Sequence, residues 1–367
     1  MANIPNLTSI SVYSVYGYNL RQRATLSLSH LTHAKLTNPD KYWVKLSSDI
    51  SRFSHYINPA SRSLEVLEIE GTYYCTETFV LPQLRSITFN SAGQLWVDDM
   101  IKPLLGSSDK LQEFVYRSAR YMDYLGRKDE DRFYDYHSYR PIDILRALRE
   151  IGSHNTIQTL ELDLRDEGNK REGNPWYFIE TSLAYWKTLK NLRITQQTLW
   201  SPASDCHRKR WGEYELEANS LRRLTDILPD SIEFFQLSDI TAEFLPSIVI
   251  LAMHVEGRKG FPKLKKVHLH PSPQLVRQLK HAVAHENDAN LMHEECKDSS
   301  CVLVSKILNC YRDAEDIFEK AGVEIKFPLE VLPLHTRNSE ILQRQQDLCH
   351  WCPECHLDGT SCLARVV

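Results

Sequence analysis

A short spacing of apolar residues recurs along most of the chain and limits the folds that the sequence can adopt. In each copy, a first apolar residue is followed three positions later by a second, and two positions after that by a third. Nine copies begin 24, 33, 20, 27, 46, 32, 43 and 32 residues apart, so the repeat is irregular and carries insertions. The copies are Leu7/Ile10/Val12, Leu31/Ala34/Leu36, Leu64/Leu67/Ile69, Leu84/Ile87/Phe89, Leu111/Phe114/Tyr116, Ile157/Leu160/Leu162, Leu189/Leu192/Ile194, Ile232/Phe235/Leu237 and Leu264/Val267/Leu269, and Val323-x-Ile325-x-Phe327 fits the end of the frame.

Each copy predicts one short β-strand, because its second and third apolar residues alternate with positions that face solvent. One such unit cannot bury its apolar face alone, whereas stacked units share a continuous core. Parallel neighbours need a crossover, and apolar residues at helical spacing occur between copies at Pro141–Ile151, Leu221–Leu228 and Gln274–His285. We therefore predict an α/β leucine-rich-repeat solenoid of nine or ten repeats. It would be a curved horseshoe with a parallel β-sheet on the concave face and helices on the convex face.

The composition is typical of a folded chain with a large core. The 367 residues are 42% hydrophobic, and Lys and Arg number 44 against 48 Asp and Glu. No basic field that would attract nucleic acid or membranes is implied. The first ten residues lack the features of a signal peptide, and the longest apolar run, Phe244–Val255, is about half a membrane span and predicts a buried helix. Nine cysteines, an odd number, favour reduced thiols, so we expect a cytoplasmic or nuclear protein.

Two phrases, LPDSIEFFQL at 228–237 and FPKLKKVHL at 261–269, resemble the leucine-rich-repeat half of fungal F-box-type proteins. The resemblance covers about residues 6–327. In that family an F-box helix bundle docks onto a cullin-based ubiquitin ligase, while the repeats hold the substrate. The resemblance therefore implies a protein–protein interaction scaffold that serves as a substrate-recognition subunit of such a ligase. The chain opens almost directly on a repeat at Leu7, so we expect no F-box in it.

Polar residues at the third, fifth and seventh positions of each copy are predicted to line one face of the sheet. The C-terminal end of this face carries Lys266, His268 and His270. The middle is acidic, through Glu68, Glu70, Glu113, Glu161 and Asp163. We expect Glu68, Glu161 and Asp163 to contact a partner protein of complementary charge; the alternative is an ordinary solvated sheet face.

Three long insertions, 117–140, 165–176 and 196–219, follow consecutive strands. Because adjacent parallel strands end at the same edge, we expect the insertions to leave one rim with their roots within about 10 Å. Aromatic residues and arginine dominate binding hot spots, so we predict a protein-binding patch there, the alternative being that the aromatics pack the insertions onto the solenoid. Interleaved acidic residues oppose a phosphate track and disfavour nucleic acid. The aromatic residues of the rim are Tyr121, Tyr124, Tyr134, Tyr136, Tyr139, Trp176, Trp200 and Trp211.

Motifs for chemistry are scarce. The sequence holds no phosphate loop, dinucleotide fingerprint, nucleophile elbow or His-Glu-x-x-His helix, so we expect no enzyme activity and no small-molecule substrate. Nothing in it predicts a membrane segment.

The last forty residues, 328–367, are predicted to be a flexible cysteine-rich tail outside the solenoid domain, 1–327. Cys349, Cys352 and Cys355 are each three residues apart, and Cys362 follows. Two thiolates at this spacing can reach one zinc ion from a tight turn, and Cys355 with either Cys362 or His356 can complete a tetrahedron. Zinc is thus the one cofactor that the sequence suggests, and a zinc-dependent interaction or nucleic-acid module is the alternative function. The competing interpretation is a tail of oxidation-prone thiols.

Overall fold

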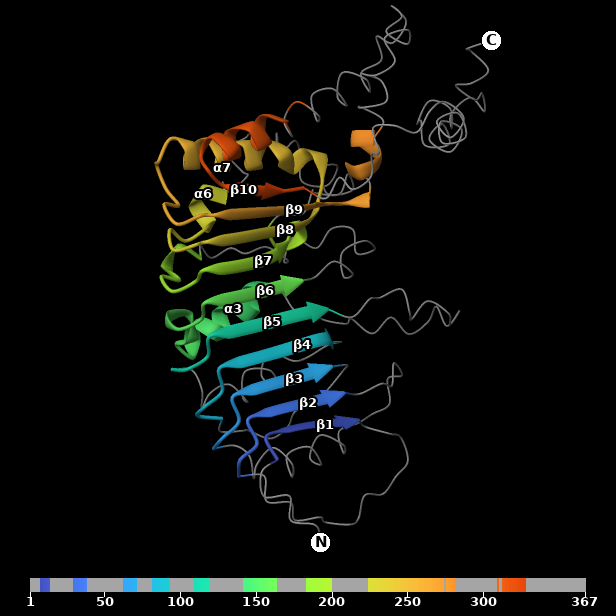
Figure 1. Ribbon diagram of the computed structural model, residues 1–367, viewed down its shortest axis with the longest axis vertical. Helices are drawn as coiled ribbons and strands as arrows, with labels where there is room; N and C mark the ends of the chain where they lie inside the picture. The colour runs from blue at the N-terminus through green and yellow to red at the C-terminus, as the bar shows by residue number, and fades with distance from the viewer. Residues whose placement is uncertain are drawn as a thin grey trace, which may run out of the picture. The chain divides into compact units, whose positions relative to one another are not determined.

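The computed structural model describes residues 7–13, 29–37, 62–70, 81–92, 109–118, 141–163, 183–199, 224–273, 275–280, 309 and 312–327. The chain divides after Phe327 into two units, Met1–Phe327 and Pro328–Val367. All described residues belong to the first unit. That unit has an α/β fold built on one ten-stranded sheet (Figure 1).

Every strand of the sheet is parallel to its neighbours, and the strands are ordered as in the chain. Each strand begins at the third position of the sequence frame or, for the last, one residue after Val323. The predicted strands and their parallel pairing are therefore confirmed. They are β1 (Ser9–Tyr13), β2 (His33–Thr37), β3 (Val66–Glu70), β4 (Ser86–Ala92), β5 (Glu113–Ser118), β6 (Thr159–Asp163), β7 (Asn191–Thr195), β8 (Phe234–Ile240), β9 (Lys266–Pro271) and β10 (Glu324–Lys326).

The apolar residues of the frame form the core behind the sheet. From the copy at Leu31 to the copy at Leu264, all of them except Ile69 are at most 6% exposed. Equivalent residues lie opposite one another in register, as Leu160 of β6 lies opposite Leu192 of β7. At the first copy, Leu7 and Ile10 are only half-buried. The core is thus continuous along the sheet, as expected for units that bury their apolar faces against each other.

The predicted crossover helices are present where the structure describes them. They are α3 (Pro141–Glu150) between β5 and β6, α6 (Leu224–Ile227) between β7 and β8, and helical residues 275–280 after β9. Two further helical segments are α7 (Leu245–Glu256) between β8 and β9 and residues 312–320 before β10. Short turns of helix occur at α4 (Gln196–Leu199), η3 (Ser153–Asn155), η5 (Leu183–Tyr185) and η6 (Ala242–Phe244).

Helix α7, which the sequence predicted to be buried, is buried along one side. Leu245, Ile248 and Leu251 are buried, whereas Ile250 is 41% exposed and Met253 is 57% exposed. The helix is apolar all round, but only one of its faces packs on the core.

A layer of hydrogen bonds joins the turns that precede the strands. The carbonyl of Gln112 accepts main-chain N–H bonds from both Gln158 and Thr159, at 2.7 and 3.0 Å, and the same pattern repeats at the other turns. Side-chain hydroxyls add a second row. In four copies a Ser or Thr stands just before the first apolar residue. Its hydroxyl donates to the main-chain carbonyl of the first apolar residue of the preceding copy, at 2.7 to 2.9 Å. These residues are Ser63, Thr156, Thr188 and Ser231. We call these four residues the hydroxyl row.

Candidate functional site

The side chains opposite the core form a second face of the sheet, which we call the outer face. It consists of the third, fifth and seventh frame positions of the strands, since side chains alternate between the two faces. Among the described residues these positions are mostly polar and exposed or half-buried. Because the strands are in register, side chains from distant parts of the sequence become neighbours in rows across the sheet.

The middle of the outer face is a connected cluster of charges. Arg117 on β5 donates two hydrogen bonds to the carboxylate of Glu161 on β6, one from Nε to Oε1 and one from Nη2 to Oε2 at 3.0 Å. Its Nη1 donates to Oδ1 of Asn90 on β4 at 2.8 Å. Arg193 on β7 donates from Nη1 to Oε2 of Glu161 at 3.3 Å. One carboxylate thus joins two guanidinium groups across three strands, and bidentate pairing of this kind fixes side-chain orientation.

Glu161 is therefore not the exposed acid that the sequence suggested. Glu161 is only 8% exposed. Its single negative charge lies beside two positive charges, those of Arg117 and Arg193. The cause is the register, which places Arg193 directly opposite Glu161 on one side. On the other side Arg117 lies opposite Asp163, one row further along, and reaches back to Glu161. Asp163 is half-buried.

The remaining predicted acids also have local partners. Lys35 of β2 lies 3.7 Å from Glu68 and 3.1 Å from Glu70 of β3. Ser86 of β4 donates its hydroxyl to Oε2 of Glu113 of β5 at 2.7 Å. These pairs are partly exposed, so each contributes little to stability. Two carboxylates share one lysine, however, and this part of the face keeps an acidic excess.

Aromatic rings continue the row beyond the charges. The guanidinium of Arg193 lies 5.6 Å from the centre of the Phe234 ring on β8, within the range of a cation–π contact. The Phe234 ring meets the ring of His268 on β9 edge to face, with centroids 4.8 Å apart. Asn90, Arg117, Glu161, Arg193, Phe234 and His268 therefore form one continuous row over six strands, which we call the polar–aromatic row.

His268 has an unusual environment. Its Nε2 atom is buried and has no hydrogen-bond partner within the described part of the chain. Burial, the positive charge of Lys326 and the neighbouring His270 lower the pKa of His268, while Glu324 acts in the opposite direction. The imidazole is therefore held in its neutral form over a wider pH range than an exposed histidine.

The C-terminal end of the outer face is basic. Glu324 of β10 lies 2.9 Å from Lys266 of β9 and 3.2 Å from Lys326 of its own strand. Hydrogen bonds from both lysines lower the pKa of Glu324. One carboxylate thus holds two ammonium groups, the reverse of the arrangement around Lys35.

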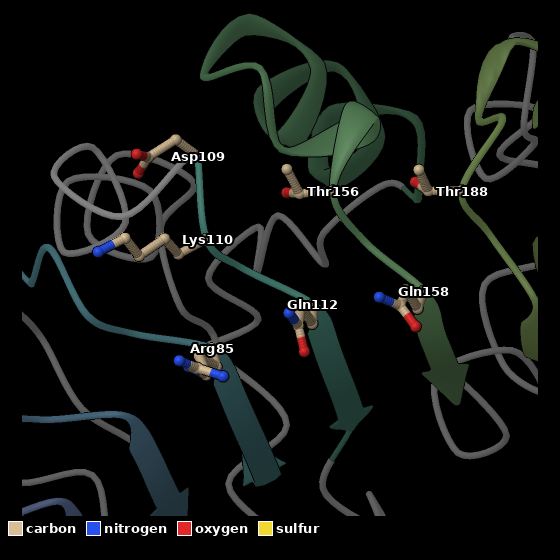
Figure 2. Close-up of a pocket in the computed structure, with 7 residues that line it drawn as sticks. All are labelled: Arg85, Asp109, Lys110, Gln112, Thr156, Gln158 and Thr188. Atoms are coloured by element: carbon tan, nitrogen blue, oxygen red, sulfur yellow. The ribbon is translucent and has the colours of Figure 1, made fainter.

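A separate hollow of about 380 Å³ lies at the turns before the strands. Figure 2 shows Gln112 and Gln158 at the starts of β5 and β6, with Thr156 and Thr188 on the turns. Much of the lining has partners already: Thr156 and Thr188 belong to the hydroxyl row, and Lys110 donates to Gln83 at 2.9 Å. The described residues around the hollow are all polar or charged and belong to the turn layer. The residues that line it are Arg85, Asp109, Lys110, Gln112, Thr156, Gln158 and Thr188.

Several predicted sites lie outside the described residues. They are the rim aromatics Tyr121, Tyr124, Tyr134, Tyr136, Tyr139, Trp176, Trp200 and Trp211, and the tail cysteines Cys349, Cys352, Cys355 and Cys362. Within the described ranges, no three His, Cys, Asp or Glu side chains gather closely enough to hold a metal ion. None of the helices described is long and apolar enough to cross a bilayer.

Arg117, Arg193 and Phe234 occupy the seventh, fifth and third frame positions of their copies, so the alternation of the frame puts them on the outer face, but their contacts were not predicted. The signal was available, because frame positions in register become neighbours, so that the fifth positions Glu161 and Arg193 could have been paired. The hydroxyl row was also missed, although a Ser or Thr stands before the first apolar residue in four copies. Comparisons with protein-family models, with curated proteins and with solved structures find no match to this chain.

Proposed function

We propose that the protein is a recognition scaffold that binds a partner protein on the outer face of its sheet. The observation that carries this proposal is the polar–aromatic row, which spans six strands and holds two arginines and an aromatic ring in fixed positions. Arginine and aromatic residues supply much of the energy of protein interfaces. Side chains that are already ordered lose less entropy on binding, which favours affinity.

The proposed scaffold is a solenoid of the leucine-rich-repeat type. Three features support this finer assignment. The frame recurs at the first nine strands and its end recurs at β10, the turns are joined by a repeated pattern of main-chain bonds, and the strands are ordered as in the sequence. In a solenoid of this kind each unit contacts its neighbours only, and the accumulated face is the binding surface.

The resemblance to fungal F-box-type proteins adds a proposal about the partner's fate. On that resemblance alone, the bound protein would be a substrate delivered to a cullin-based ubiquitin ligase. Co-purification of ligase subunits with the tagged chain supports this branch. Their absence, with other partners retained, leaves a scaffold without a ligase role.

Affinity purification of the tagged full chain, followed by mass spectrometry, tests the proposal. Gln236 lies on the outer face of β8, opposite Arg193 of β7 and His268 of β9 in register, and Gln236→Arg adds bulk and charge there. Met253→Arg, on the exposed side of α7, is the matched control. We expect Gln236→Arg to lose partners that wild type and Met253→Arg retain, with equal melting temperatures for all three. Identical partner sets for the two variants would contradict the proposal.

The insertions at the rim need their own arm of the same experiment. Alanine replacement of Tyr134, Tyr136 and Tyr139 together tests whether partner binding depends on the rim, as the sequence predicts. Loss of partners in this variant, with Gln236→Arg unaffected, would move the site from the outer face to the rim.

A further inference from the structure

Acidic and basic side chains of the outer face are separated along the sheet. From β2 to β6 the face carries two cations, Lys35 and Arg117, against five carboxylates, a formal charge of −3. The carboxylates are Glu68, Glu70, Glu113, Glu161 and Asp163. From β7 to β10 the third, fifth and seventh frame positions carry three cations, Arg193, Lys266 and Lys326, against the carboxylate of Glu324, a formal charge of +2 with histidines neutral. Asp239, at the register shift near the end of β8, lies outside these positions. The local ion pairs do not remove this difference, because their stoichiometry differs between the two ends.

The two charged regions are too far apart to cancel. Adjacent strands are about 4.8 Å apart, so β3 and β9, six strands apart, are separated by about 29 Å. The screening length at physiological ionic strength is about 8 Å. A partner on the face therefore meets an acidic region and a basic region as distinct surfaces.

The ion pairs at the two ends of the face show the same separation of charge. At the acidic end Lys35 is shared by Glu68 and Glu70, at 3.7 and 3.1 Å. At the basic end Glu324 is shared by Lys266 and Lys326, at 2.9 and 3.2 Å. Each shared group leaves one charge of the majority sign available to an incoming ligand.

We propose that the outer face binds a segment of a partner protein whose charges are divided in the opposite sense. Its cationic residues lie over β3–β5 and its anionic residues over β9–β10, so the segment crosses the strands with one fixed polarity. This inference rests on the proposed function, and it specifies the partner's chemistry and orientation. A nucleic acid fits the surface poorly, because its uniform row of phosphates must pass over the carboxylates of β3–β6.

A two-block peptide tests the charge match on the full chain. The probe has six lysines and six glutamates separated by a flexible linker that spans about 30 Å, and the control peptide has the same residues in alternating order. We expect the two-block peptide to bind about tenfold more tightly at low salt and to lose this advantage at high salt. Equal affinity for the two peptides would overturn the proposal.

Photo-crosslinking tests the polarity. With a crosslinker at the glutamate end of the two-block peptide, we expect labelled tryptic peptides from β9 and β10. With the crosslinker at the lysine end, we expect labels on β3–β5. Labels that do not depend on which end carries the crosslinker overturn the proposed orientation. Tighter binding of a single-stranded deoxythymidine 20-mer than of the two-block peptide overturns the choice of a protein ligand.

Charge variants link the binding to the named residues. Lys266→Glu with Lys326→Glu should weaken the two-block peptide about tenfold, and the milder pair Lys266→Gln with Lys326→Gln about threefold. Lys187→Glu with Lys263→Glu makes the same net change at exposed turn positions and is the control. Equal weakening by the control pair would show that only net charge matters and would overturn the inference. If the two-block peptide shows no fixed orientation, while Gln236→Arg still loses partners in the affinity purification, this inference is refuted and the proposed function stands.

Discussion

The hydroxyl of Thr156 donates a 2.7 Å hydrogen bond to the carbonyl of Leu111, although the two residues are 45 positions apart in the sequence. Thr188 bonds to the carbonyl of Ile157 across 31 positions in the same way. The same hydrogen bond thus forms at the turn before each of these strands, although the segments between the copies differ in length. In the four copies that carry it, the hydroxyl row aligns the first apolar residue with that of the copy before it, whatever the length of the insertion between them.

Loss of the Thr156 hydroxyl should destabilise the fold measurably. Thr156→Val preserves the shape but leaves the Leu111 carbonyl without this donor, which should lower the free energy of unfolding by about 1 to 2 kcal/mol. Thr156→Ser keeps the donor and should cost less. Urea titration followed by circular dichroism measures both. Thr88→Val on the outer face is the matched control and should change stability by less than about 0.5 kcal/mol; a similar loss at both positions would contradict the role of the row.

The strands could be predicted because their signal is local and repeated. One pair such as Leu160 and Leu162 is weak evidence by itself, whereas nine copies of the same frame predict the strands and their parallel sheet. Contacts that do not recur with the frame could not be predicted from the sequence. The side-chain amide of Gln196 accepts from the Thr241 N–H at 2.7 Å and donates to its Oγ1 at 3.0 Å. This contact joins the ends of β7 and β8, yet nothing in the spacing of the sequence indicates it.

Neutralising Glu161 should disrupt the polar–aromatic row. In Glu161→Gln the guanidinium groups of Arg117 and Arg193 lose the charge between them, and hydrogen bonds to a charged group weaken. Because both arginines are partly exposed to solvent, we expect a cost of only about 1 to 2 kcal/mol in the free energy of unfolding. Glu68→Gln, which touches only the exposed pair with Lys35, should cost less than about 0.5 kcal/mol. A double-mutant cycle with Arg193→Gln isolates the coupling, and a coupling of zero would contradict the network.

The outer face contains side-chain contacts that the spacing of the sequence does not predict. The alternation of the frame predicts correctly that Glu161 and Asp163 face away from the core. It does not predict which cations each carboxylate pairs with in the assembled sheet, because the partners come from neighbouring strands. Arg117 is the example: it lies opposite Asp163 in register, yet two of its donors reach Glu161. Long side chains can reach diagonal neighbours, so strand register alone does not determine their partners.

The cysteine-rich tail gives a prediction that the sequence alone supports. If Cys349, Cys352, Cys355 and Cys362 hold a structural zinc ion, the purified full chain should contain about one zinc ion per molecule. Inductively coupled plasma mass spectrometry measures this zinc content. Cys352→Ser should then remove it, because one thiolate of the tetrahedron is lost. Cys75→Ser, at a cysteine far from the tail in sequence, is the control and should retain the metal. Zinc-free wild-type protein purified under reducing conditions would remove the zinc alternative.

Stability should depend on pH through His268. In the unfolded chain a histidine titrates near its ordinary pKa of about 6.5, whereas burial, Lys326 and His270 lower the pKa of His268 in the folded protein, against the opposing charge of Glu324. Between the two values, the unfolded chain binds more protons than the folded one. The free energy of unfolding contributed by this group therefore falls as the pH drops below about 6.5 and is recovered as the pH rises.

Two variants separate His268 from the other histidines of the chain. His268→Gln cannot be protonated, so the decrease in stability between about pH 7 and pH 5 should become shallower than in wild type. Lys326→Met removes a cation that lowers the His268 pKa, so the midpoint of the His268 imidazole titration, followed by NMR, should move to higher pH. Lys266 remains in this variant and continues to act in the original direction, so the shift should be partial. A wild-type titration of His268 at or above the ordinary pKa would contradict the buried, cation-flanked environment on the outer face.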